Sequence, residues 1–153
     1  MGPQLREIDA RIEQVEIALR DLLVNRLGDD PAAIPPHICP NVEKRIQTAV
    51  RKSPFVKEEE LARLGKQLEH FDLRELQQTI ASKAAWDRFA PIFAAKEALE
   101  VKFNQLAELR NGIRHSRTID EVTRREGEAA ILWFEQCLRR TGREGGNAGF
   151  DRS

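Results

Sequence analysis

The stretch Leu106-Ala107-Glu108-Leu109-Arg110-Asn111-Gly112-Ile113-Arg114-His115-Ser116-Arg117 carries the clearest signal for the fold of this chain. Apolar residues recur at helical spacings up to and through it: Leu99, Phe103, Leu106 and Ile113. Because an Asn-Gly pair is typical of a helix end, the pattern predicts a helix over about 94–111 that breaks at Gly112.

Arg110 falls in the middle of the apolar sector of this predicted helix. A guanidinium stays charged at any ordinary pH, and its desolvation without a partner is costly. The residue therefore needs an anionic partner, a subunit interface or a ligand. The alternative is an arginine of a last helical turn that contacts free carbonyl groups and reaches water with its charged end.

His115 follows Arg110 by five residues and is flanked by Arg114 and Arg117. On a continuous helix this spacing would place the Arg110 and His115 side chains about 140° apart. A break at Gly112 would instead allow them to converge on one ligand. The flanking arginines make this the densest positive patch near a predicted helix end.

These side chains suit the cleavage of RNA without a metal ion. A histidine that titrates near neutrality can accept the proton of the 2′-hydroxyl or protonate the leaving oxygen. Arg110 can stabilise the charge that develops on the phosphorus centre through a bidentate contact. Because DNA lacks the 2′-hydroxyl, this chemistry would select RNA.

The first helix is predicted over 3–27. Its apolar residues form a heptad stripe: Leu5, Ile8, Ile12, Val15, Leu19 and Leu22. Two interpretations stay open. The stripe packs within its own domain, or part of it, represented by Ile12, Val15 and Leu19, forms a dimer interface.

The rest of the chain also shows helical patterns. We expect helices over about 41–52 and 57–69, and a further one that begins at the N-cap Asp72 with Glu75 three residues later. Trp86, Phe89 and Phe93 form an aromatic stripe typical of a core. Thr118 and Glu121 form a second predicted capping box, and it opens the last helix, whose expected inward residues are Ile119, Val122, Ala130, Trp133 and Cys137.

These patterns predict an all-α protein, a helical bundle of about five main helices with short extra helices. We expect one domain over 1–141 and a flexible, glycine-rich tail over 142–153. Lys and Arg total 25 and Asp and Glu total 25, so the net charge is zero with neutral histidines. This balance argues against a general basic surface for nucleic acid, and any RNA contact must be local.

Metal, disulfide and membrane features are not expected. His37 and Cys39 lack further ligands at a recognisable spacing, so the sequence predicts neither a metal site nor a cofactor. Cys39 and Cys137 suggest no disulfide framework. With no signal peptide and no apolar run of transmembrane length, the expected location is the cytoplasm.

The run Arg110-Asn111-Gly112-Ile113-Arg114-His115 resembles the motif of the HEPN superfamily: an arginine, a polar residue directly after it, and a histidine after four to six intervening residues. Three other segments are similar to the Swt1-like HEPN branch: Leu19-Arg20-Asp21-Leu22-Leu23, Phe71-Asp72-Leu73 and Trp86-Asp87-Arg88-Phe89. The likeness covers roughly residues 5–140.

The resemblance implies a helical bundle that forms a homodimer and brings two copies of the motif together. Active members of the family are metal-independent endoribonucleases, common in antiviral defence and toxin–antitoxin systems. By match, Arg110 and His115 are the catalytic pair and Asn111 is the supporting polar residue, while Arg114 and Arg117 would bind RNA. Arg117 stands where one toxin branch has a tyrosine, so the nucleotide modification of that branch is not expected.

A second interpretation comes from a different functional class. Many members of the family have lost activity and serve as binding or assembly modules. The heptad face of the first helix and the Arg110 stripe would then bind a protein partner, such as an antitoxin or a subunit of a defence complex; an RNA-binding module without activity is the other form of this interpretation.

Overall fold

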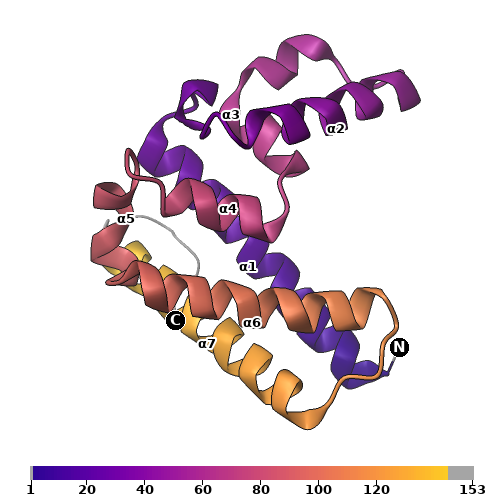
Figure 1. Cartoon of the computed structure of the whole chain (residues 1–153), viewed down its shortest axis with the longest axis vertical. Coiled ribbons are helices and arrows are strands. Elements are labelled where there is room, and N and C mark those ends of the chain that lie inside the picture. Colours follow the sequence, from indigo (N-terminus) through magenta and orange to yellow (C-terminus); the bar gives the residue numbers. More distant parts are fainter. Residues whose placement is uncertain (1, 145–153) are drawn as a thin grey trace. The chain divides into compact units, whose positions relative to one another are not determined.

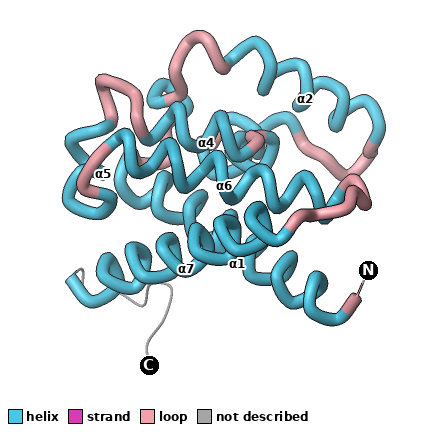
Figure 2. Tube along the Cα trace, turned by 60° about the horizontal axis from the view of Figure 1, so that its bottom comes forward, coloured by secondary structure: helices cyan, strands magenta, loops and turns pink. Residues whose placement is uncertain are grey.

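The computed structural model describes residues 2–144, and all the regular secondary structure within that range is helical (Figure 2). The predicted all-α class is confirmed. The elements are α1 (Pro3–Leu27), η1 (Pro31–Ala33), α2 (Cys39–Lys52), η2 (Glu58–Ala62), α3 (Leu64–Gln67), η3 (Leu68–His70), α4 (Leu73–Ile80), α5 (Trp86–Phe93), α6 (Lys96–Arg114) and α7 (Glu121–Glu144).

The chain divides into two compact units. Of the described residues, 2–18 and 90–144 belong to the first unit and 19–89 to the second. The long helix α1 contributes to both units, since the division falls after Ala18.

The first unit is built on the antiparallel pair α6 and α7, which lie side by side (Figure 1). Phe103 of α6 and Phe134 of α7 meet edge to face, with ring centroids 4.9 Å apart. Phe93 stacks on Trp133 with centroids 5.8 Å apart. Buried aromatic rings contribute large apolar areas and prefer these offset and perpendicular arrangements. The aromatic core therefore fixes the end of α6 opposite to the motif.

Helix α1 has the predicted bounds and ends at Gly28, whose positive φ of +72° favours glycine. Its heptad stripe is core. Ile12, Val15 and Leu19 are each 0% exposed within a single chain. Side chains without accessible area cannot bury area against a partner, so the expected dimer interface at these three residues is wrong.

Gly127 allows α6 and α7 to approach closely. A Cβ atom built on Gly127 would lie 2.6 Å from Cβ of Leu109, which is fixed to the α6 backbone. We expect Gly127→Ala to lower the free energy of unfolding by up to about 2 kcal/mol, because an overpacking cost of about 1–3 kcal/mol outweighs the gain of about 1 kcal/mol in helix propensity. Chemical denaturation measures this difference.

Ala129, on the exposed side of α7, provides the matched control for Gly127. Ala129→Gly should lower the free energy of unfolding by about 1 kcal/mol, the difference in helix propensity between alanine and glycine. A Gly127→Ala variant more stable than the native protein would show that the two helices can separate at no cost.

In the second unit, an arginine joins α2 to the start of α4. Arg45 donates to the backbone carbonyl of His70 at 2.8 Å and forms an ion pair with the buried carboxylate of Glu75. The predicted capping box of Asp72 and Glu75 is confirmed, with both reciprocal hydrogen bonds formed. Glu75 therefore serves the cap and the ion pair at once.

The single helix expected over 57–69 is wrong. The chain forms η2, α3 and η3 instead, and the extended backbone of Arg63 (φ −100°, ψ 140°) separates the first two. Asp29 causes this break: it accepts hydrogen bonds from the Gly65 N–H at 2.8 Å and from Arg63 Nε at 2.6 Å. The same two bonds, that of Gly65 first, lower the pKa of the Asp29 carboxyl.

The last helix begins later and ends later than predicted. Asp120, and not Thr118, caps α7, accepting a hydrogen bond from the Thr123 N–H at 2.8 Å that lowers the Asp120 pKa. Val122, expected to face inward, is 66% exposed, whereas Ala130 and Cys137 are buried as predicted. Residues 142–144 belong to α7 and not to the tail, and residues 145–153 lie outside the described part.

Candidate functional site

The motif stretch lies on α6, and the helix runs through Gly112 to Arg114. The expected break at Gly112 is therefore wrong. Gly112 is needed for packing: a Cβ atom there would lie 2.9 Å from Cγ1 of Ile119, in the segment before α7. The glycine allows the chain to fold back over the end of α6, and the helix continues past it.

The helix ends two residues after Gly112, at Arg114, in a Schellman motif. Ser116 adopts the left-handed conformation (φ 53°). The Arg117 N–H donates to the carbonyl of Gly112 at 3.0 Å, and the Ser116 N–H donates to that of Ile113 at 3.3 Å. His115 is consequently the last residue of near-helical backbone, at the tip of α6.

Arg110 has the anionic partner that its position in the sequence required. Its Nε donates to Oε1 of Glu16 on α1 at 2.7 Å. The Glu16 side chain is 8% exposed and that of Arg110 is 26% exposed. This pair uses one nitrogen of the guanidinium, and among the described residues the structure gives its two terminal nitrogens no partner. Those donors lie on a side chain that solvent, and hence an anion, can reach.

A second pair joins the same two helices. Arg114 Nε lies 3.6 Å from Oδ1 of Asp9. The two carboxylates are seven residues apart on α1 and the two arginines four apart on α6, with the order reversed. Sequence analysis missed Asp9 and Glu16, although acidic residues one heptad apart beside a buried stripe were the available signal.

Asn111, His115 and Arg117 are exposed at the tip of α6. Asn111 and His115 are four residues apart, so they project from the same face of the helix. Arg110 and His115 project about 140° apart, because the helix between them is unbroken. Within one chain, α6 thus brings the histidine beside the asparagine and turns the paired arginine toward α1.

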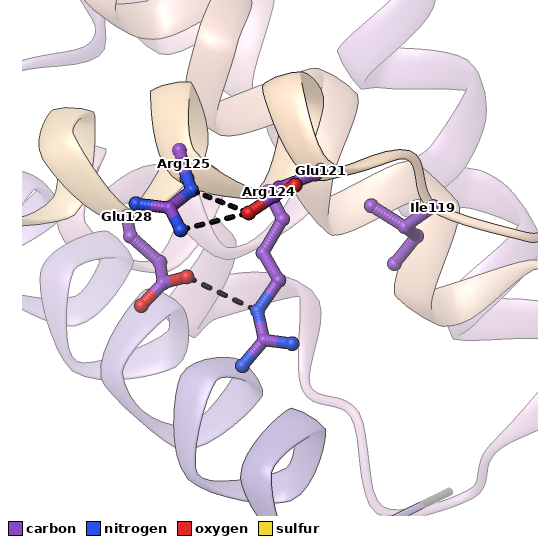
Figure 3. Close-up of a pocket in the computed structure, with 5 residues that line it drawn as sticks. All are labelled: Ile119, Glu121, Arg124, Arg125 and Glu128. Atoms are coloured by element: carbon purple, nitrogen blue, oxygen red, sulfur yellow. Dashed lines mark hydrogen bonds and ion pairs between the residues drawn. The ribbon is translucent and has the colours of Figure 1, made fainter.

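A pocket adjoins this end of α6. Figure 3 shows its lining: Ile119, Glu121, Arg124, Arg125 and Glu128. Arg125 Nη2 lies 2.7 Å from Glu121 Oε1, and Arg124 Nε lies 3.1 Å from Glu128 Oε1. Two arginines and two glutamates balance each other, so the lining does not favour an anion such as phosphate.

The described residues offer neither a metal site nor a membrane-spanning helix. Among them, no group of three or more His, Cys, Asp or Glu side chains is arranged to hold a metal ion. Within the same part of the chain, no helix is both long and apolar enough to cross a bilayer. Cys39 and Cys137 are free thiols, and burial raises the pKa of Cys137.

Comparison with protein-family models, with curated proteins and with solved structures finds no match to this chain. The motif and the geometry around it are therefore the observations that bear on function.

Proposed function

We propose that this chain is a metal-independent endoribonuclease of the HEPN type that acts as a homodimer, as an effector or toxin of prokaryotic antiviral defence in the cytoplasm. The observation that carries the proposal is the exposed His115 at the tip of α6, beside Asn111 and between Arg114 and Arg117. An accessible imidazole among cationic groups is the arrangement that proton transfer at an RNA phosphate requires.

The proposed roles follow from the placement of each side chain. His115 transfers the proton at the 2′-hydroxyl or at the leaving oxygen, and Asn111 on the same face holds the substrate through its amide. Arg117, which is exposed, and Arg114, whose side chain is 40% exposed, contact the RNA backbone. Arg110 stabilises the transition-state charge with its terminal nitrogens while Glu16 holds its Nε.

The divergence of Arg110 and His115 on one helix is the reason for a dimer in this proposal. Two side chains about 140° apart around a helix axis do not face one phosphate. A second copy related by a two-fold axis can supply the missing residue, so that each site combines Arg110 of one chain with His115 of the other.

Cleavage of a single-stranded RNA in the presence of EDTA tests this proposal. We expect the same rate with EDTA and with added Mg²⁺, because no step requires a metal ion. The same oligonucleotide with 2′-deoxyribose throughout should remain intact, because it lacks the attacking hydroxyl. Cleavage that stops in EDTA, or that proceeds equally on the deoxy substrate, would contradict the mechanism.

One observation favours a second candidate function, a non-catalytic module that binds RNA or an antitoxin or defence-complex protein. Arg110 already has a partner in Glu16, so the fold alone accounts for its charge. This candidate predicts a stable complex with no RNA turnover, and the cleavage assay separates it from the first.

A further inference from the structure

The second unit contains a groove that the proposed function does not use. After α2 the chain turns back, so that η2 lies beside the helix (Figure 1). Four apolar residues line the groove: Ile46, Val50, Leu61 and Ala62. They are half-buried or exposed, whereas Val42 of the same helix is fully covered. The groove therefore leaves apolar area open to solvent.

Three polar side chains of α2 also line this groove. Glu43, Gln47 and Arg51 follow one another at steps of four residues and are all exposed. Neither Glu43 nor Arg51 forms an ion pair with any residue that the structure describes. Helix α2 thus presents a row with a negative end, an amide in the middle and a positive end.

This row is complementary to itself in the antiparallel direction. If two copies of α2 cross with Gln47 on a two-fold axis, Glu43 of each copy lies opposite Arg51 of the other. Both ion pairs form at once, and the two glutamine amides can hydrogen-bond to each other at the axis. Two-fold contacts are isologous, so one surface must match itself, as this one does.

We propose that the α2 groove is a self-association surface whose occupant is α2 of a second copy of this chain. The apolar lining provides the area to be buried, and the row Glu43–Gln47–Arg51 sets the antiparallel direction. Phe55, three residues after the end of α2, is 87% exposed and is a further apolar side chain open to solvent in this unit. This surface belongs to residues 19–89, whereas the proposed RNA site belongs to the other unit.

An amphipathic peptide whose charges are all of one sign fits these observations less well than a second copy does. The two charges of the row have opposite signs, so a uniformly acidic or basic peptide would meet repulsion at one end. A second copy meets attraction at both ends by symmetry.

Charge exchange between two copies tests this inference. Glu43→Arg gives a row with two positive ends, and Arg51→Glu gives a row with two negative ends. Each variant alone places like charges opposite each other twice in the two-fold contact. An equimolar mixture of the two variants restores both attractive pairs between unlike copies.

Sedimentation equilibrium over a concentration series measures the association. We expect each single variant to associate about tenfold or more weakly than the native chain, and the mixture to return to the native strength. Lys44→Glu, a charge reversal at an exposed residue of α2 outside the groove lining, should leave association unchanged. If the chain also dimerises through the proposed RNA site, assemblies larger than that dimer should be lost in each single variant and return in the mixture.

Two results would overturn the inference: single variants that associate as strongly as the native chain, or a mixture that associates no more strongly than its components. RNA cleavage in the same samples keeps the two proposals apart. Glu43 and Arg51 lie outside the proposed RNA site, so recovery of association in the mixture supports the surface whether or not RNA is cut.

Discussion

Replacing His115 by alanine is expected to slow RNA cleavage by about 100-fold or more without changing the stability of the protein. General acid–base catalysis by one side chain contributes about 10²–10⁴ in rate. His115 is exposed at the tip of α6, and its backbone N–H donates to the carbonyl groups of Asn111 and Ile113. Single-turnover cleavage in EDTA gives the rate, and thermal unfolding followed by circular dichroism gives the stability.

His37 provides the matched control for this experiment. It is an exposed histidine of the second unit, where it makes one hydrogen bond, 3.2 Å long, with Gln78. His37→Ala should leave cleavage at the native rate. Unchanged cleavage by a well-folded His115→Ala sample would remove His115 from the mechanism and leave the non-catalytic candidate.

A mixture of His115→Ala with Arg110→Met extends the test to the second subunit. Random exchange makes about half of the dimers mixed, and each mixed dimer has one complete site of two, so about a quarter of the native activity should return. No recovery, from chains that do exchange, would mean that the site does not combine residues of two chains.

Local signals in the sequence predicted much of the fold. Helix α1 has the predicted bounds because its apolar stripe runs along the helix and Gly28 directly follows its last residue. The cap of α4 was found because Asp72 and Glu75 are three residues apart. The stripe of aromatic residues contributed Phe89 and Phe93 to the core, as predicted. These features depend on residues that are close in sequence.

The predictions failed where distant residues decide the local structure. Asp29 interrupts the segment expected to be one helix over 57–69, and it is 36 residues away from Gly65. Gly112 was predicted to end the helix because a pattern of apolar residues does not show that this glycine packs against Ile119. In both cases a tertiary contact overrides the intrinsic preference of the segment.

The candidate site was predictable where neighbouring residues decide its geometry, and not where distant residues do. That Arg110 needs an anionic partner follows from its apolar surroundings, but the identity of Glu16, 94 residues away, does not. The proximity of Asn111 and His115 follows from a spacing of four on a helix that is now known to be continuous. Because the helix continues past Gly112, the His115 side chain diverges from that of Arg110 instead of converging with it as predicted.

Arg110→Met is expected to lower the free energy of unfolding by about 2–3 kcal/mol. The change removes the arginine that pairs with Glu16, a carboxylate that is 8% exposed and keeps a further contact. Breaking a fully buried ion pair costs about 3–5 kcal/mol, and the 26% exposure of Arg110 reduces that cost. Urea denaturation of the native and variant proteins measures the difference.

The double variant Arg110→Met/Glu16→Leu separates the role of Arg110 in the fold from its proposed role with RNA. Replacing both members of a buried pair by apolar residues is often neutral, so stability should return to within about 1 kcal/mol of native. RNA cleavage should stay low in both variants, since neither has the Arg110 guanidinium that stabilises the transition state in the proposed mechanism. If the stable double variant cuts RNA at the native rate, Arg110 serves the fold alone, and the motif loses its catalytic arginine.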